Sequence, residues 1–441
     1  MLPVQLDRTA PGPLGTQLAG RIRNLLSSGG LPRGARLPSS RALAADLGVS
    51  RSVTEHAYEQ LLAEGWVETR HGAGTYVASG GHAAVAAVPV RRTVTPPELV
   101  PLDAGTPWID PRHAAGWRRA WREVSSARPP RGYDDPRGLP DLRAALAERL
   151  SRTRGVLVEP DEVLVTAGST DGLRHVVGAL PPGPIGVEDP GYRAAVETVR
   201  SLGREVRSLP ATGPVTSMAG LVAGYVTPAH QHPLGRVMPA EDRLGLLAAA
   251  QAADALVVED DYDSEFRWDV APVPALASLD RSRVVYLGTA AKAVAPSLRL
   301  GWLVAPEALR EAVNRRREIT HDAAPWPVQR AFLALLRDGY VDRVVRSARR
   351  VYAARAPRVA AVMAPYAEAT GPDAGMYSTW LLPPGVALRV RDAAAAAGFG
   401  VNLLDDYCRG TALTGVVLGF GGVTDAELDR ALAVIDRTLA D

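Results

Sequence analysis

The rest of this chain is organised around the segment Tyr286-Leu-Gly-Thr-Ala-Ala-Lys292-Ala-Val-Ala-Pro-Ser-Leu-Arg299-Leu-Gly-Trp302. Lys292 is the only lysine in the protein, although lysine and arginine together number 50. Arginine cannot replace a lysine whose nitrogen must lose its proton, because guanidinium stays protonated in proteins. A primary amine can attack a carbonyl and form a Schiff base. The alternative is that Lys292 has no functional role and is a chance lysine in an arginine-rich composition. The nearby Arg299 and the Gly-Thr turn disfavour this alternative.

Length and composition limit the number of domains and the classes of protein to which this chain can belong. With 441 residues the chain is long enough for two or three domains. The formal net charge of +2 indicates neither a nucleic-acid nor a membrane partner by itself. A single cysteine, Cys408, excludes an internal disulfide framework and a cysteine-based zinc site. No apolar run reaches the roughly 18 residues that span a bilayer, and no signal-peptide pattern is present, so we expect a cytoplasmic protein without a metal site.

The N-terminal block, residues 1–78, has the pattern of a small helical domain with a β-hairpin. Apolar spacing predicts helices over 14–26, 41–47 and 51–64, and the last two are joined by the tight turn Gly48-Val-Ser50. Two short helices joined by a glycine-containing turn indicate a helix-turn-helix. Residues 65–77 then predict two short strands around a glycine-rich tip, which is a wing. The alternative is a small helical bundle with a solvated arginine face.

The placement of arginines in this block favours DNA. Eight arginines stand against six acidic residues, so the count alone does not indicate a nucleic-acid partner. However, Arg36, Arg41 and Arg51 lie in a loop and at helix starts, while the acids fall mostly later. Early residues of a recognition helix read base edges, and arginine suits guanine and phosphate.

Several motifs resemble the winged helix-turn-helix of GntR-family transcription regulators. They are Leu37-Pro-Ser-Ser-Arg41-Ala-Leu-Ala, Leu47-Gly-Val-Ser-Arg51, Ala57-Tyr-Glu-Gln-Leu61 and Glu64-Gly65 followed by Gly72-Ala-Gly74-Thr-Tyr-Val. The resemblance implies that double-stranded operator DNA is bound by Arg36, Arg41, Ser50, Arg51, Ser52, Gly72 and Gly74. Thr54 departs from the family, which usually has an apolar residue there, so looser packing or altered base readout is expected at this position.

The remainder divides into a linker and a large domain. Residues 79–100 are rich in alanine, valine, glycine and proline and show little periodicity, which is typical of a tether. From residue 101 to 441, apolar strand-like runs alternate with helical runs, which predicts a mostly parallel α/β sheet. The C-terminal tail predicts a smaller α+β subdomain. Ligands bind at turns after strands in such sheets, and chemically capable residues occur in four of these turns: 167–172, 227–235, 259–262 and the Lys292 turn.

The large domain resembles fold-type I PLP-dependent aminotransferases along nearly its whole length. The resemblance is carried by Gly132-Tyr133-Asp-Asp-Pro-Arg-Gly138, Glu188-Asp-Pro-Gly-Tyr192, the Thr-Pro-x-His-Gln loop from Thr227, Glu259-Asp-Asp-Tyr262, and Leu418-Gly-Phe420. It implies a Schiff base between Lys292 and pyridoxal 5'-phosphate (PLP). The other implied cofactor-binding residues are Asp260 at the pyridinium N–H, Tyr262 at O3′, Tyr192 stacked on the ring, Ser169, Thr170, Thr289 and Arg299 at the phosphate, and Tyr133 from a partner subunit.

Two positions depart from the aminotransferase pattern. Ala291 stands where the family usually has a serine, so one phosphate-binding hydroxyl is missing. Val417 stands where an aminotransferase has the arginine that grips the substrate carboxylate. Loss of that arginine favours a sensor over an enzyme, although Arg409 lies nearby and is a possible substitute.

The two resemblances together match the MocR subfamily of GntR regulators, which joins these domains in one chain. They imply a homodimeric, head-to-tail, PLP-binding transcription regulator without catalytic residues, cytoplasmic and nucleoid-associated when bound to DNA. PdxR-like members, whose effector is PLP itself, fit the missing clamp, so we expect control of vitamin B6 or amino-compound metabolism. Two alternatives stay open: an active aminotransferase with an appended DNA-binding domain, and a regulator whose degenerate site no longer holds PLP.

Overall fold

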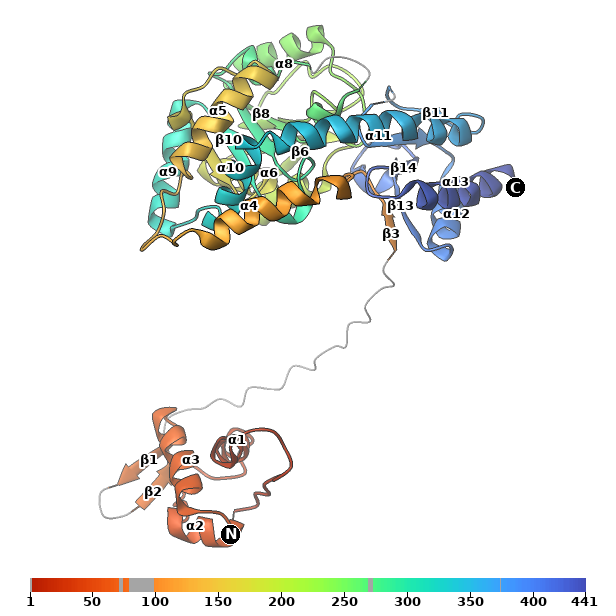
Figure 1. The fold of residues 1–441 in the computed structure, drawn as a ribbon. Coiled ribbons are helices and arrows are strands. Elements are labelled where there is room, and N and C mark those ends of the chain that lie inside the picture. The colour runs from red at the N-terminus through yellow and green to blue at the C-terminus, as the bar shows by residue number, and fades with distance from the viewer. Residues whose placement is uncertain (1, 71–73, 79–98, 269–272, 373) are drawn as a thin grey trace. The chain divides into compact units, whose positions relative to one another are not determined.

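The structure is a computed structural model that describes residues 2–70, 74–78, 99–268, 273–372 and 374–441. The chain divides into two compact units, Met1–Pro96 and Pro97–Asp441 (Figure 1). Val100, the last residue of the expected linker, already belongs to a strand of the second unit. No helix in the described ranges combines the length and apolar character needed to cross a membrane.

The N-terminal unit confirms the predicted helices and hairpin. Its elements are α1 (Leu14–Ser27), α2 (Ser40–Leu47), α3 (Arg51–Ala63), β1 (Val67–Arg70) and β2 (Gly74–Val77). Leu18, Ile22, Leu43 and Leu61 are fully buried and form its core. The Ser39 hydroxyl caps α2 by accepting from the Ala42 N–H at 3.1 Å.

The turn between α2 and α3 depends on Gly48, whose φ of 60° is left-handed and therefore favours glycine. Thr54 is fully buried, and its hydroxyl donates to the Ser40 carbonyl at 2.8 Å and lies 2.8 Å from the Arg51 carbonyl. The expectation of looser packing at Thr54 is therefore wrong. The hydroxyl links α3 to the first turn of α2.

The large unit is built on a mixed sheet with strand order β4-β10-β9-β8-β7-β5-β6. These strands are β4 (Val163–Thr166), β5 (Ile185–Asp189), β6 (Val206–Pro210), β7 (Ala223–Val226), β8 (Leu256–Asp261), β9 (Val284–Thr289) and β10 (Gly301–Val304). All pairings are parallel except those of β10 with its two neighbours. The predicted mostly parallel sheet is confirmed. β10 runs antiparallel because the connection from β9 is too short for a crossover helix.

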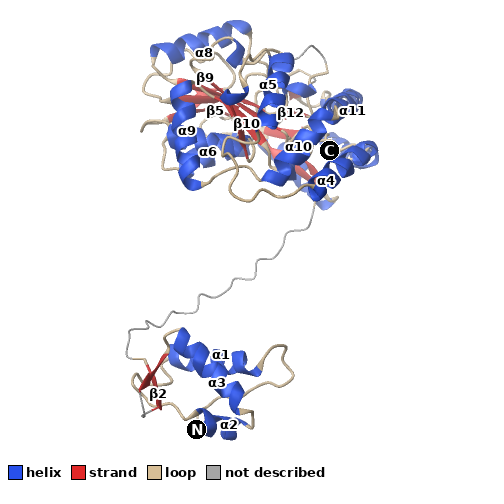
Figure 2. Cartoon of the chain, turned by 60° about the vertical axis from the view of Figure 1, so that its left-hand side comes forward, coloured by secondary structure: helices blue, strands red, loops and turns tan. Residues whose placement is uncertain are grey.

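Helices cover both faces of this sheet (Figure 2). The helices are α4 (Ala114–Ser126), α5 (Pro140–Arg154), α6 (Ser169–Ala179), α7 (Arg193–Ser201), α8 (Ala240–Ala252), α9 (Glu307–Thr320) and α10 (Trp326–Arg337). Apolar side chains of α6, α7 and α9 form one buried cluster, and those of α5, α8 and α10 belong to the other. The sheet is thus buried on both sides, as its continuous apolar strands require.

The C-terminal subdomain is a second, smaller sheet with strand order β11-β12-β14-β13-β3. Its strands are β3 (Val100–Leu102), β11 (Glu368–Ala369), β12 (Tyr377–Leu381), β13 (Phe399–Leu403) and β14 (Gly415–Gly419). The helices α11 (Tyr340–Met363), α12 (Pro384–Ala396) and α13 (Asp425–Ala440) complete it. The α+β expectation is therefore confirmed. The pairing of β3 with β13 brings the start of this unit next to its end.

Candidate functional site

A cavity of about 160 Å³ lies at the carboxyl ends of the parallel strands of the large sheet. Its walls come from the turn after β4 and from the ends of β5, β7, β8 and β9. The lining residues are Ala104, Gly105, Ser169, Thr170, Tyr192, Tyr225, Thr227, His232, Asp260, Tyr262, Thr289, Ala291, Lys292, Pro296 and Arg299. Every predicted cofactor residue except Tyr133 lines it.

Asp260 places a carboxylate in the floor of the cavity. Its Oδ2 accepts from the Tyr225 hydroxyl at 2.6 Å, while Oδ1 has no hydrogen-bond partner among the described residues. Burial raises the pKa of Asp260 to about 6, partly offset by the Tyr225 hydrogen bond. An unpartnered buried carboxylate oxygen is costly, so the site fits a ligand that brings an N–H or a cation to this point.

Lys292 places a primary amine at the same cavity. Its Nζ donates to the Gly105 carbonyl at 2.5 Å. Burial lowers the pKa of Lys292, although the nearby acids Asp263, Asp103 and Asp260 oppose that shift. A lowered pKa increases the fraction of neutral amine, which is the form that attacks a carbonyl.

Three other lining residues, Ser169, Thr170 and Arg299, are suited to an anion. Ser169 and Thr170 are the first two residues of α6, so their backbone N–H groups lie at the positive end of a helix. Arg299 has a left-handed backbone (φ 48°), and its guanidinium lies beside Gly168. Gly168 itself has a φ of 107°, a conformation that favours glycine. Hydroxyls, helix amides and a guanidinium together are the donors that bind a phosphate.

Aromatic side chains also line the cavity. The ring of His232 makes edge contacts with Tyr192 at 5.4 Å and with Tyr262 at 5.7 Å. Burial, together with the charge of Lys292, lowers the pKa of His232 to about 3, so the imidazole is neutral. Tyr262 is fixed by its hydroxyl, which lies 2.8 Å from that of Tyr377 and donates to the His230 carbonyl at 3.0 Å. The walls are therefore uncharged and suit a flat aromatic ligand.

The two departures from the aminotransferase pattern have clear structural settings. Ala291 lines the cavity without a hydroxyl, and its N–H donates to Thr289 Oγ1 at 3.1 Å. Val417 is fully buried in β14, between Thr379 and Asn402 of the neighbouring strands. Neither position supplies a polar side chain to a ligand.

Arg409 does not replace the missing clamp. Its Nη2 donates to the Val187 carbonyl at 2.6 Å and to the Glu188 carbonyl at 3.0 Å. Arg409 is not among the cavity-lining residues, and its guanidinium instead ties the C-terminal subdomain to β5. Within the described part of the lining, Lys292 and Arg299 are the cations.

Tyr133 lies outside the cavity of its own chain. Its side chain is 83% exposed, and its ring stacks on that of His321, with centroids 4.2 Å apart and planes at 7°. Its place at the cavity of another subunit therefore stays a prediction.

Sequence reasoning missed several lining residues, including Gly105, Tyr225 and His232. His232 lay within a loop singled out for its polar residues, but nothing marked it out from its neighbours there. Tyr225 lies in an apolar strand, where a tyrosine is expected to be a residue of the hydrophobic core. A buried tyrosine one residue before the end of a parallel strand is the one available signal, because strand ends form the site.

In the N-terminal unit, the predicted DNA-binding residues lie around the start of α3 and the wing. Arg41 is exposed on α2, Ser50 precedes α3, and the hydroxyls of Ser50 and Ser52 are 2.8 Å apart. Arg36 forms an isolated β-bridge with Tyr76, and its guanidinium lies beside Gly74. Gly72 lies outside the described residues.

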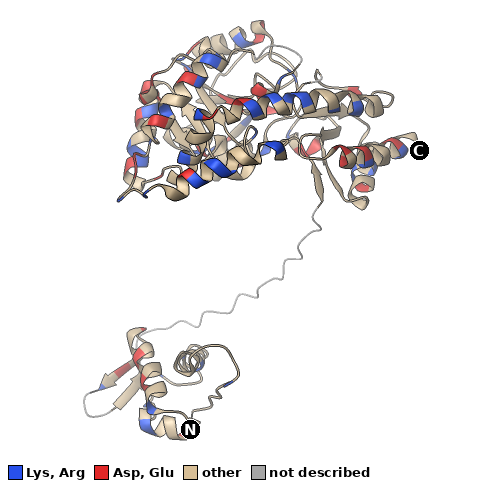
Figure 3. Ribbon diagram, in the orientation of Figure 1, with Lys and Arg blue, Asp and Glu red and all other residues tan. Residues whose placement is uncertain are grey.

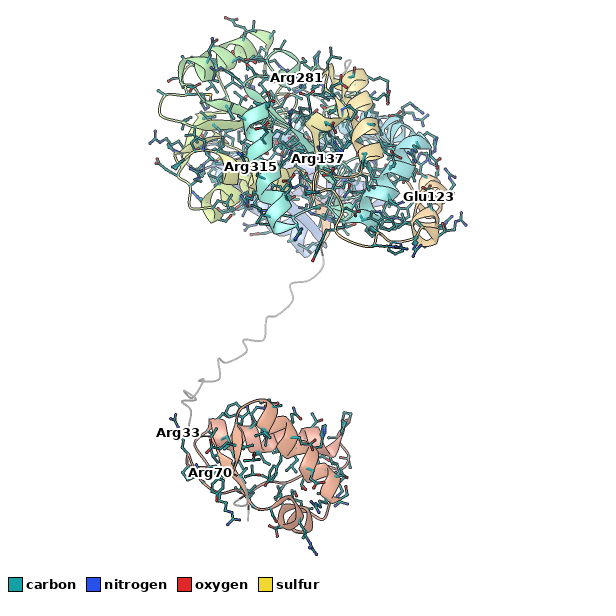
Figure 4. The ribbon with its side chains drawn as sticks, turned by 90° about the vertical axis from the view of Figure 1, so that its left-hand side faces the viewer. Arg33, Arg70, Glu123, Arg137, Arg281 and Arg315 are labelled. Carbon is teal, nitrogen blue, oxygen red and sulfur yellow. The ribbon has the colours of Figure 1, made fainter. Side chains whose placement is uncertain are left out.

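Charge divides this unit along α3. Basic residues gather where α2 and α3 meet, and acidic residues follow along α3 (Figure 3). Arg33 and Arg70 lie on the side of the unit that carries the wing (Figure 4). The basic groups that phosphate contacts require are therefore grouped near the predicted recognition helix.

Comparisons with known proteins agree with this division. Residues 14–77 match the family of bacterial regulatory proteins of the gntR family, and residues 97–435 match aminotransferase class I and II. Among solved structures, an archaeal alanine:glyoxylate aminotransferase is similar with a TM-score of 0.71 and 23% identity, covering 78% of this chain and 91% of that one. Aspartate aminotransferase from Thermus thermophilus is similar with a TM-score of 0.67 and 25% identity, over 78% and 92% of the two chains.

Two curated relatives match over nearly their whole length. The pyridoxine biosynthesis transcriptional regulator PdxR of Corynebacterium glutamicum is 35% identical, covering 100% of this chain and 99% of its own. The probable rhizopine catabolism regulatory protein MocR of Rhizobium meliloti is 35% identical, covering 95% and 92%. Both matches run across the DNA-binding unit and the aminotransferase-like unit. The chain therefore belongs to the MocR subfamily of GntR-type transcription regulators, in which an aminotransferase-like domain is joined to a winged helix-turn-helix.

Proposed function

We propose that this regulator senses PLP, held in the cavity by a Schiff base with Lys292, and controls genes of vitamin B6 or amino-compound metabolism from the cytoplasm. The observation that carries the proposal is the pairing of a lone lysine amine with an unpartnered carboxylate oxygen of Asp260 in one cavity. The name of the Corynebacterium relative, a regulator of pyridoxine biosynthesis, supports the choice of vitamin B6 genes as targets.

The residues fit each chemical part of PLP. Its aldehyde, when present, supplies an electrophile for the amine of Lys292. Asp260 holds a proton or a positive charge at the ring nitrogen, Tyr192 stacks on the ring, and Tyr262 contacts O3′. The phosphate is bound by hydroxyls, helix amides and the guanidinium of Arg299. With Ala291 in place of a serine, one hydrogen bond to the phosphate is lost, and hydrogen bonds to charged groups contribute about 1.5–3 kcal/mol.

A sensor role follows from what the cavity lacks. If Lys292 and Arg299 are engaged by PLP, no described cation lining the cavity is left to hold the carboxylate of an amino acid. An aminotransferase needs such a group to orient its substrate, because correct positioning supplies much of its rate. No observation favours turnover, so an active enzyme is kept only as an outcome of the test.

We also propose that the regulator acts as a head-to-tail homodimer. The exposed Tyr133, stacked on His321, is then available to the phosphate end of the partner's cavity. A two-fold symmetric dimer presents two α3 helices and favours operator DNA with paired half-sites.

The test uses the fact that Lys292 is the only lysine. The full chain is titrated with PLP, and visible absorbance of a Schiff base is recorded before and after addition of an amino-acid panel. Borohydride reduction followed by peptide mass analysis then locates the attachment. We expect one PLP on the peptide of Lys292, absorbance that survives the panel, and an altered affinity for operator DNA.

Lys292→Ala and the charge-preserving Lys292→Arg are expected to abolish both the absorbance and the PLP effect on DNA binding. A normal PLP response in Lys292→Arg contradicts the proposed mechanism. Bleaching by one amino acid with keto-acid product indicates the aminotransferase alternative. Absence of any binding to PLP indicates a degenerate site.

A further inference from the structure

The ion pair between Arg51 and Glu55 on α3 is unlike the other ion pairs of the N-terminal unit. Arg51 Nε lies 2.8 Å from Glu55 Oε1, one helical turn away, and the two side chains are 65% and 42% exposed. The carboxylate therefore lies at the Nε edge of the guanidinium. Neither terminal nitrogen of Arg51 has a hydrogen-bond partner within the described residues, so both can be offered to a ligand.

Two other arginines of this unit are held differently. Arg23 donates through both Nε and Nη2 to the two oxygens of Glu64, at 2.7 and 2.6 Å. Arg70 donates through Nε and Nη2 to Glu68. In each of these pairs the acid occupies one side of the arginine fork, including a terminal nitrogen.

The Arg51–Glu55 pair is poorly placed to stabilise its helix. Arg51 is the first residue of α3, where the positive end of the helix dipole disfavours a cation. Exposed ion pairs of this spacing also add little to stability. A role in binding explains the pair better than a role in folding.

We propose that Glu55 is a specificity-determining positioning residue, which holds the guanidinium of Arg51 so that its two terminal nitrogens face one guanine of each operator half-site. This inference rests on the proposed place of Arg51 at the DNA. An arginine that presents two donors matches the O6 and N7 acceptors of guanine in the major groove. An arginine whose guanidinium rotates freely binds a backbone phosphate as well as it binds guanine. Removing Glu55 should therefore lower the preference for one base while keeping the affinity for DNA of any sequence.

The orientation of α3 itself is fixed by Thr54, next to Glu55, through its hydrogen bond to the Ser40 carbonyl. Glu55 therefore acts on a side chain whose backbone is already placed. Replacing Glu55 is expected to change where Arg51 points without moving the helix.

The test is in vitro selection from a random duplex DNA library with the full-length protein and its variants. In Glu55→Ala we expect the preference at one base pair of each half-site to fall by at least roughly fivefold. Glu55→Gln is expected to restore most of it, because its amide oxygen can still lie at the Nε edge. Arg51→Lys keeps the charge but cannot present two terminal nitrogens, so it is expected to lose the preference at the same base pair.

Glu59→Ala is the matched control, because it removes the same charge from the same helix without an ion pair to Arg51. It is expected to keep the wild-type preference. Equal base preferences in wild type, Glu55→Ala and Glu59→Ala overturn the inference. Equal losses in Glu55→Ala and Glu59→Ala also overturn it, because they point to charge alone. If the wild-type protein enriches no sequence, the proposed operator contacts fail, and this inference fails with them.

Discussion

Replacing Asp260 with asparagine tests the central electrostatic feature of the cofactor cavity. Asp260 is buried, and its Oδ1 has no partner within the described residues, so its charge is available to a ligand. Hydrogen bonds to charged groups contribute about 1.5–3 kcal/mol. Asp260→Asn is therefore expected to weaken the binding of a pyridinium-bearing ligand roughly 10- to 150-fold at neutral pH.

The pH dependence gives this prediction a sign. Because burial raises the pKa of Asp260 to about 6, the carboxyl becomes neutral in the free protein as the pH falls below that value. Affinity for a protonated ring nitrogen should then fall in the wild type, approaching roughly tenfold per pH unit. The asparagine variant has no such group and is expected to show a flatter profile in this range.

Calorimetric titration with pyridoxamine 5'-phosphate is the appropriate assay. This ligand has the ring and the phosphate but no aldehyde, so the ionisation of Lys292 needed for condensation does not enter the measurement. Tyr225→Phe is the companion variant, because it removes the donor to Oδ2 and leaves the carboxylate in place. It is expected to weaken binding less than Asp260→Asn does. Equal affinity of Asp260→Asn and wild type at neutral pH, or an identical dependence on pH, refutes the reasoning.

Two further predictions concern stability. Thr54→Val removes a buried hydroxyl that donates to the Ser40 carbonyl, so it should lower the free energy of unfolding of the N-terminal unit by about 1 kcal/mol. It should also weaken DNA binding but not PLP binding. Thermal unfolding measures the change against Thr54→Ser, which keeps the hydroxyl, and equal stability of the two variants contradicts the prediction. For Glu188, burial raises the pKa from 4.5 to about 7, outweighing its hydrogen bonds from Thr227. Glu188 therefore contributes up to about 3 kcal/mol to the free energy of unfolding. This stabilisation is fully present below pH 4.5 and is lost as the pH rises through about 7. Denaturant unfolding of the free protein should show that Glu188→Gln loses less free energy of unfolding than the wild type across that pH range. An equal dependence on pH in the two proteins contradicts a raised pKa of Glu188.

Much of the architecture was readable from local patterns. Apolar spacing predicted α1, α2 and α3 to within two residues at each end, because these amphipathic helices each bury one stripe. The tight turn at Gly48 was predicted from residue type alone. The antiparallel direction of β10 was not predicted, although the connection from Thr289 to Gly301 is too short for a crossover helix and its length is readable from the sequence.

The site divides in the same way. Motif positions brought Lys292, Asp260 and Arg299 to the candidate list, and the fold brings them to one cavity. In the run Glu259-Asp260-Asp261, side chains alternate across the sheet. Asp260 faces the cavity, whereas Asp261 pairs with Arg154 at 2.5 Å. The alternation is readable from the chain, but which face carries the site is known only once the sheet is packed.

Residue type and order alone established the two families, the residue that can condense with a carbonyl, and the absence of an arginine at position 417. These are properties of residue type and order, which do not change on folding. The tertiary structure decided how distant groups are used, as with Arg409. Its place in the sequence makes Arg409 a candidate clamp, but in the fold its guanidinium donates to carbonyls of β5. A long flexible side chain reaches many partners, so its role depends on which acceptors the folded chain places within hydrogen-bonding distance.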